Sequence, residues 1–286
     1  MSRLSLLITV SLALVVGLAV SSAYSGCALP AEPAAPARLK VVTSTSLLTY
    51  IVQRVGGDRV DVVNIVPPAQ HPGDFDASPR DIRRLAEADL FLLHGWPGES
   101  YAPGLIEAVA NPRLSVVPIE VPGNWMTPSV QVEATELVAA ALSRADADNE
   151  ARYRKAAEEY KDAAIAKSAE IQFRLRGTGV SGTPVLSSFW QAGFAEWAGL
   201  WVIATYGPAE LTPQSVRKLV DEGREARVRL VIDNLHSGRD AGKGIAEELD
   251  CARVILSNFP GAFDDTETWE EAIERNIELI LEALVR

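Results

Sequence analysis

From residue 39 onward, the sequence alternates between short apolar runs and longer stretches with an apolar residue at every third or fourth position. The short runs, such as Leu90–Leu93, do not alternate with polar residues, which is typical of strands buried on both faces. The longer stretches, such as residues 47–55, place their apolar side chains on one side of a helix. Strand and helix in regular alternation predict a parallel sheet covered by helices on both faces.

This alternation occurs twice, and a different kind of segment separates the two halves. Residues 150–175 contain neither Pro nor Gly and are rich in Ala, Glu, Lys and Arg, so they predict one long helix. We therefore expect an α/β fold of two lobes, each with a central parallel sheet and flanking helices, joined by one long connector helix. The predicted boundaries are an N-terminal lobe at 39–147, a connector at 148–177 and a C-terminal lobe at 178–286. The predicted strands are residues 39–45, 60–66, 90–93, 114–118, 183–187, 200–204, 229–232 and 253–256.

The first residues have the pattern of a secretory signal. Arg3 is the only charged residue before Glu32, residues 4–20 are an unbroken apolar run, and small residues follow up to Gly26. A positive start, an apolar stretch and a small-residue exit predict that residues 1–27 are a signal peptide. An uncleaved membrane anchor is the alternative, although the apolar run is short for a membrane span.

The end of this signal resembles a bacterial lipobox. In the order Ala-Tyr-Ser-Gly-Cys, Cys27 is the candidate lipidated residue, although Tyr24 stands where an aliphatic residue is usual. An Ala/Pro-rich tether at residues 28–38 follows. We therefore expect an extracytoplasmic protein, in the periplasm or on the cell surface, with Cys27 as its candidate lipid anchor. The other cysteine, Cys251, lies in an apolar pattern and is predicted to be a small core residue.

The charge balance excludes one class of partner. The formal net charge is −11, and the chain is 48% hydrophobic, which is ordinary for a globular protein. Nucleic-acid binding requires clustered Lys and Arg, so we expect no nucleic-acid partner.

Three histidines are the main candidates for a binding site. His71, His94 and His236 are the only histidines in the sequence, and each follows a predicted strand. Parallel sheets bind ligands at the carboxyl ends of their strands, so these imidazoles are candidate ligands of Zn²⁺ or another divalent metal. Asp233 and Asp74 are candidates for a fourth ligand or for a group that orients the imidazoles. The alternative is that each histidine is a surface or hydrogen-bonding residue of its own loop.

Aromatic and small polar residues are predicted beside the same strand ends. Trp96 and Trp190 follow strands, and Ser188 directly follows the predicted strand 183–187. A bare metal ion gains nothing from aromatic walls, whereas a flat organic molecule or a metal chelate gains by stacking and burial. Packing between the lobes is the other explanation for these side chains.

The order of several motifs resembles the solute-binding proteins of zinc and manganese ABC transporters. The motifs are VVTST, IVPPAQHPGDFDASPRDIRRLAEADLFLLHG, WMTP, FAEWAGL, LTPQSVRKLVDE and WEEAIERNIELI, and the likeness covers residues 39–286. The resemblance implies two α/β lobes joined by a long helix, capture of a divalent metal outside the cytoplasm, and delivery to a membrane permease.

The metal ligands that the resemblance implies are not present in this sequence. The four corresponding positions hold Gly73, Gly123, Ser188 and Asn258. The chain thus looks like a divergent member of the family. His71, two residues before Gly73 in the same loop, is a candidate replacement for the first ligand.

We therefore expect the substrate-binding component of a metal-ion ABC importer, with Zn or Mn as transported ligand, no catalytic cofactor, and an ABC permease as partner. The protein is expected to be a monomer and not an enzyme. One alternative keeps the scaffold and changes the ligand to a metal chelate or a non-metal small molecule. Others are a secreted zinc hydrolase, for which the sequence lacks an HExxH motif, and a surface adhesion or sensor module.

Overall fold

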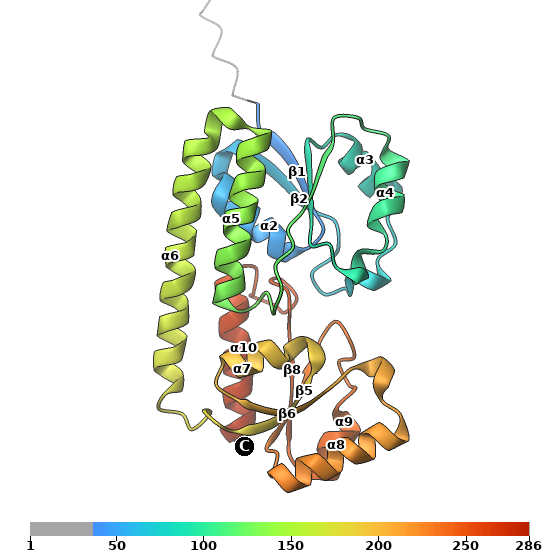
Figure 1. Ribbon diagram of the computed structural model, residues 1–286, viewed down its shortest axis with the longest axis vertical. Helices are drawn as coiled ribbons and strands as arrows, with labels where there is room; N and C mark the ends of the chain where they lie inside the picture. Colours follow the sequence, from blue (N-terminus) through green and yellow to red (C-terminus); the bar gives the residue numbers. More distant parts are fainter. Residues whose placement is uncertain (1–36, 286) are drawn as a thin grey trace, which may run out of the picture. The chain divides into compact units, whose positions relative to one another are not determined.

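The computed structural model describes residues 37–285. The predicted signal peptide, Cys27 and the tether up to residue 36 lie outside the described residues. The chain from Arg38 onward forms one compact unit. It contains two four-stranded sheets and the helices that cover them (Figure 1).

The N-terminal sheet is parallel, with the strand order β2-β1-β3-β4. Helix α3 shows how the sequence sets a boundary, because Ser78 and Asp81 form a reciprocal capping box at its start. The strands are β1 Leu39–Thr43, β2 Val60–Asn64, β3 Leu90–Leu93 and β4 Ser115–Pro118. The helices are α2 Ser46–Gly56, α3 Pro79–Ala86 and α4 Ala102–Val109, with single turns η1 Gly57–Arg59, η2 Pro72–Asp74 and η3 Pro97–Glu99.

The C-terminal sheet repeats this topology with the order β6-β5-β7-β8, again all parallel. Thr212 and Ser215 cap α8 as Ser78 and Asp81 cap α3. The strands are β5 Pro184–Ser188, β6 Trp201–Tyr206, β7 Leu230–Asn234 and β8 Ala252–Leu256. The helices are α7 Ala192–Trp197, α8 Pro213–Ala226 and α9 Lys243–Leu249, with single turns η5 Phe189–Gln191 and η6 Pro208–Glu210. The prediction of two parallel sheets with flanking helices is confirmed.

Three long helices run beside the sheets: α5 Pro128–Ala145, α6 Glu150–Leu175 and α10 Trp269–Val285, with the turn η4 Ala147–Asn149 between α5 and α6. In Figure 1, α6 runs lengthwise beside both sheets, as expected for a connector helix. One buried apolar cluster contains Val41 of β1, Tyr160 of α6 and Leu230 of β7. The two sheets therefore share a hydrophobic core. Among residues 37–285, no helix is long and apolar enough to span a membrane.

Candidate functional site

The loops that follow strands of the two sheets contact each other directly. Three hydrogen bonds join the two regions, and each connects a loop or the first turn after a strand of one sheet with its counterpart on the other sheet. They are His236 Nε2 to Pro68 O at 2.8 Å, Ser46 Oγ to Pro260 O at 2.7 Å, and Asn124 Nδ2 to Trp190 O at 2.8 Å. The carboxyl ends of the two sheets thus meet, which is where α/β sheets bind ligands.

His71 lies at the start of η2, in the loop after β2. Its Nδ1 accepts a hydrogen bond from the Gly73 amide at 2.9 Å, so the ring proton of the neutral imidazole is on Nε2. The residue is partly buried. A positive charge on His71 lowers the pKa of His236.

His236 lies in the loop after β7, and the opposite lobe fixes its tautomer. Its Nε2 donates to the Pro68 carbonyl, because a carbonyl only accepts, and Nδ1 keeps its lone pair without a partner. Burial lowers its pKa to about 4; the Pro68 bond opposes this shift and His71 adds to it. His236 is therefore a neutral imidazole at pH 7 with one unused nitrogen.

His94 is a core residue and not a residue of the contact between the loops. Its ring stacks on Trp96 with centroids 3.6 Å apart and planes 6° apart, and meets Trp125 edge-on at 4.2 Å. Its Nε2 is 2.7 Å from Thr45 Oγ1. Only 1% of the residue is exposed, and burial lowers its pKa well below the usual value.

The predicted set of three histidines is not assembled. In residues 37–285, no three His, Cys, Asp or Glu side chains gather closely enough to hold a metal ion. The physical reason is that His94 is buried in an aromatic cluster, where Trp96 stacks on its ring and Trp125 meets it edge-on. His71 and His236 remain as the pair on facing loops.

Of the two aspartates predicted as further ligands, Asp233 is buried and hydrogen-bonded, and Asp74 is exposed. Asp233 is fully buried, and Oδ1 accepts from Tyr206 Oη and from the Gly242 amide, both at 2.7 Å. Its Oδ2 accepts from Arg253 Nη1 at 2.6 Å. Asp233 therefore anchors the loop that carries His236. Asp74 is exposed on η2.

At the positions where the resemblance implies metal ligands, this chain has residues with other structural properties. Gly123 has a φ of +107°, and a side chain there would bring Cβ to 3.1 Å from Val130 Cγ2, so a larger residue is disfavoured. Asn258 accepts a hydrogen bond from Gln191 Nε2 at 2.9 Å. Ser188 is buried at the end of β5, and its hydroxyl has no partner. None of these residues is a strong metal ligand.

Several buried polar residues of this region were not predicted from the sequence. Glu99 of η3 accepts from the backbone amides of His94, Gly95 and Trp96, at 3.1, 2.8 and 3.2 Å. Burial raises its pKa although these bonds favour the carboxylate. Gln191 and Asn234 are fully buried at the ends of β5 and β7. For Asn234 the available signal was a polar residue at the end of an apolar strand, which the histidines also carry; Gln191 and Glu99 end the single turns after β5 and β3 and had no such signal.

The two predicted tryptophans differ in their surroundings. Trp96 belongs to the cluster with His94 and lies 6.5 Å from the Phe259 ring of the other lobe. This favours packing between the lobes over a ligand wall. Trp190 is 49% exposed and meets Phe189 edge-on at 5.3 Å. Of the two, Trp190 is the one accessible to a ligand from solvent.

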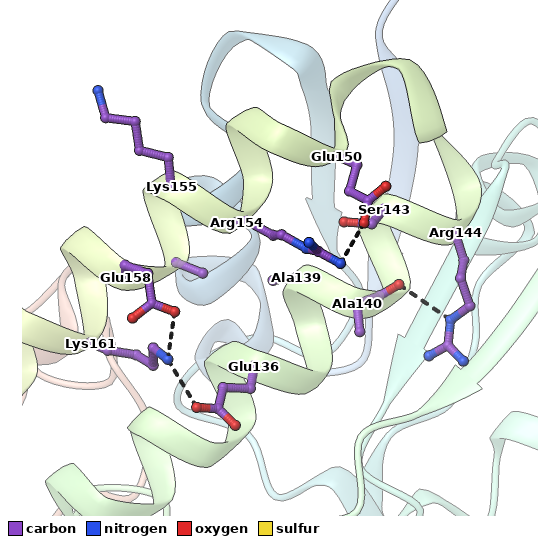
Figure 2. A pocket seen from close by; sticks show the side chains of 11 residues that line it. Glu136, Ala139, Ala140, Ser143, Arg144, Glu150, Arg154, Lys155, Glu158 and Lys161 are labelled. Atoms are coloured by element: carbon purple, nitrogen blue, oxygen red, sulfur yellow. Dashed lines mark hydrogen bonds and ion pairs between the residues drawn. The ribbon is translucent and has the colours of Figure 1, made fainter.

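A depression of about 770 Å³ lies between α5 and α6 (Figure 2). Lys161 pairs there with Glu136 and Glu158, both at 2.9 Å, and Arg154 pairs with Glu150 at 2.6 Å. The positive charges of Lys161 and Arg154 are thus already paired with carboxylates of the same two helices. All residues that line the depression lie on α5 and α6. The loops between the sheets are therefore the better candidate site.

Comparisons with known proteins identify the family of this chain. The profile of the family described as "Zinc-uptake complex component A periplasmic" (ZnuA) matches residues 41–283. The chain is 22% identical over 287 residues to the manganese ABC transporter substrate-binding lipoprotein PsaA of Streptococcus mitis, covering 89% of this chain and 92% of that protein. It is 25% identical to the iron-binding protein YfeA of Yersinia pestis, covering 74% of each chain.

Solved structures show the same fold. The substrate-binding protein FpvC of Pseudomonas aeruginosa, in complex with Ni²⁺, superposes with a TM-score of 0.73 at 20% identity, covering 87% of this chain and 97% of FpvC. The Mn-bound periplasmic metal-binding protein of Candidatus Liberibacter asiaticus gives a TM-score of 0.73 at 17% identity, covering 86% of this chain and all of that protein. Because the family profile spans nearly all of the described residues, the chain belongs to the ZnuA family of periplasmic substrate-binding proteins of metal ABC transporters.

Proposed function

We propose that this chain captures its cargo between the strand-end loops of its two sheets and hands it to an ABC permease outside the cytoplasm. The observation that carries the proposal is the direct contact of these loops in a chain that the family profile matches over residues 41–283. The relatives are substrate-binding proteins, and we infer that this chain likewise performs no catalysis. We further propose that it acts as a monomer and that Cys27 is its lipid anchor.

The proposed cargo contains a divalent transition metal, with Zn and Mn as the first candidates. His71 and His236 are proposed as its protein ligands, because both imidazoles lie on facing loops, and imidazole suits Zn, Ni and Cu. His236 offers its unpartnered Nδ1, whereas His71 would bind through Nε2 after loss of its proton, or through Nδ1 after its bond to the Gly73 amide breaks. The Pro68 carbonyl supports His236 in this role, since metal-binding histidines commonly donate their other ring N–H to a carbonyl. Two nitrogens are fewer than the four ligands of a usual zinc site.

A second candidate is a cargo other than a bare ion, either a chelate or a non-metal small molecule. It is favoured by one observation: the positions of the family's ligands hold Gly73, Gly123, Ser188 and Asn258. No carboxylate stands at any of them.

Native mass spectrometry of the mature protein with Zn²⁺ and with Mn²⁺ tests metal capture, together with the melting temperature. Metal binding at a hundred times Kd should stabilise the fold by about 2.7 kcal/mol. His71→Ala and His236→Ala should each abolish the mass shift, whereas Asp74→Ala, at the exposed neighbour, should retain it. Unchanged mass and melting temperature at saturating metal would refute capture of the bare ion. A shift that survives both histidine variants would refute this pair as ligands.

A further inference from the structure

Three uncharged side chains at the end of the C-terminal sheet are buried and have unused hydrogen-bonding atoms. Ser188 is 1% exposed, and Gln191 and Asn234 are fully buried. Among residues 37–285, Ser188 Oγ, Gln191 Oε1 and Asn234 Nδ2 have no hydrogen-bond partner. Buried polar atoms are nearly always paired in native proteins, so such a group of exceptions requires an explanation.

The three side chains lie at one place in the fold. Ser188 ends β5, which pairs with β7, and Asn234 ends β7, where it is in register with Leu256 of β8. The Gln191 side chain lies at the same strand ends, because its Nε2 donates to the carbonyl of Leu256, the residue paired with Asn234. The donor–acceptor distance is 3.2 Å. His236 follows Asn234 by two residues, and its unpartnered Nδ1 adds a fourth unused atom. The group therefore belongs to the surface that meets the N-terminal lobe.

The partners of the amide groups decide which of their atoms are free. Asn234 Oδ1 accepts from the amides of His236 and Ser237, both at 2.8 Å, so its free group is the N–H donor. Gln191 Nε2 donates to Leu256 O and to Asn258 Oδ1, so its free atom is the carbonyl acceptor. The hydroxyl of Ser188 can do either. The cluster thus offers a donor, an acceptor and a hydroxyl.

This chemistry does not suit a bare cation. An amide N–H group cannot bind a metal ion, and the nearby carboxylate of Asp233 is already paired with Arg253 at 2.6 Å. A small organic molecule can satisfy all three groups, because it can present both acceptors and donors. Leaving such groups unpaired costs free energy, so a ligand that pairs them gains affinity.

We propose that the cargo is a metal held by a small organic ligand: Ser188, Gln191 and Asn234 bind the organic part by hydrogen bonds. This inference rests on the proposed function, in which His71 and His236 bind the metal. Two imidazoles leave coordination positions for donor atoms of the organic ligand. The chemical class is an uncharged or weakly charged chelate with both hydrogen-bond donors and acceptors.

Isothermal titration of the mature protein with three probes tests this: Ni²⁺ alone, L-histidine alone, and an equimolar mixture of the two. The mixture should bind at least ten times more tightly than Ni²⁺ alone, and native mass spectrometry should show one Ni and one histidine added together. Ser188→Ala should weaken binding of the mixture about tenfold, since the organic ligand loses a hydrogen bond to a buried hydroxyl. It should leave the melting temperature of the ligand-free protein unchanged, because the hydroxyl has no partner within the protein.

Two further variants sharpen the result. Asn234→Asp keeps the oxygen that accepts from the two backbone amides and replaces the free N–H donor with an acceptor. This variant should therefore also bind the mixture more weakly. Ser143→Ala on α5 removes another buried, unpaired hydroxyl far from the strand ends in sequence and should have no effect. If Ni²⁺ alone binds as tightly as the mixture, or if neither site variant weakens the mixture, this inference is overturned and the proposed metal capture stands. If neither Ni²⁺ nor the mixture binds, this inference is overturned, and the titrations with Zn²⁺ and Mn²⁺ decide separately whether the proposed metal capture stands.

Discussion

The Nε2 atom of His236 lies 2.8 Å from the carbonyl oxygen of Pro68, although the two residues are 168 positions apart in the sequence. The bond joins the loop after β7 to the loop after β2. It fixes the tautomer of His236, so the contact between the lobes determines which ring nitrogen carries the proton. A ligand that approaches His236 Nδ1 therefore meets a ring whose orientation the other lobe has set.

Removing this bond should lower the stability of the protein. His236→Ala should decrease the free energy of unfolding by about 1–2 kcal/mol, because the Pro68 carbonyl loses its donor. His236→Gln should restore part of this, since its amide N–H can reach the same carbonyl. Urea denaturation monitored by circular dichroism measures both. His71→Ala is the matched control, because the His71 ring bonds only within its own loop. Equal losses for the Ala and Gln variants would contradict the proposed role of the bond.

The buried His94 should make stability depend on pH. Its pKa is lowered in the folded protein, so the unfolded chain takes up a proton at a higher pH than the folded one. Its contribution to stability is thus present above a pH of about 6.5 and is lost as the pH falls below that value. The free energy of unfolding of His94→Gln should consequently fall less steeply between pH 7 and 5 than that of the wild type. Parallel curves for the two proteins would show that His94 does not contribute.

Arg253 should contribute much more to the free energy of unfolding than an exposed arginine such as Arg275. Arg253→Ala leaves the Asp233 carboxylate buried without its cation, which typically costs about 3–5 kcal/mol. The same substitution at Arg275, whose partners Glu278 and Glu282 are about half exposed, should cost less than about 1 kcal/mol. Chemical denaturation of the two variants provides the comparison. A similar small loss for both would mean that Asp233 is protonated or paired differently.

Much of the fold follows from local sequence patterns. The strand Leu90–Leu93 and the helix Glu150–Leu175 have the predicted bounds, because an unbroken apolar run and an uninterrupted run of helix-forming residues are both local properties. Ser78 with Pro79 also marks the start of α3. The first strand is shorter than the predicted residues 39–45, since it ends at Thr43 and α2 begins at Ser46.

The site was less predictable because its geometry depends on residues far apart in the sequence. The position of His94 after a strand is a local fact, but its burial results from stacking on Trp96 and contact with Trp125. Asp233 looked like a ligand because it also ends a strand, yet Arg253 of the neighbouring strand neutralises it. No local pattern distinguishes a side chain that faces the other lobe from one that packs beneath it.

Glu99 provides the last test, since this buried residue holds the loop that carries His94 and Trp96. Its two carboxylate oxygens accept three backbone N–H groups. In Glu99→Gln, one oxygen becomes an amide N–H₂ group that faces N–H donors, so at least one donor loses its partner. We expect a loss of about 2–3 kcal/mol in the free energy of unfolding. The near-ultraviolet circular dichroism of the tryptophans should also change, because the stack of His94 on Trp96 depends on this loop. Glu107→Gln, at an exposed residue of α4, should change neither quantity. A stable Glu99→Gln variant with an unchanged tryptophan spectrum would show that the carboxylate is not needed to hold the loop.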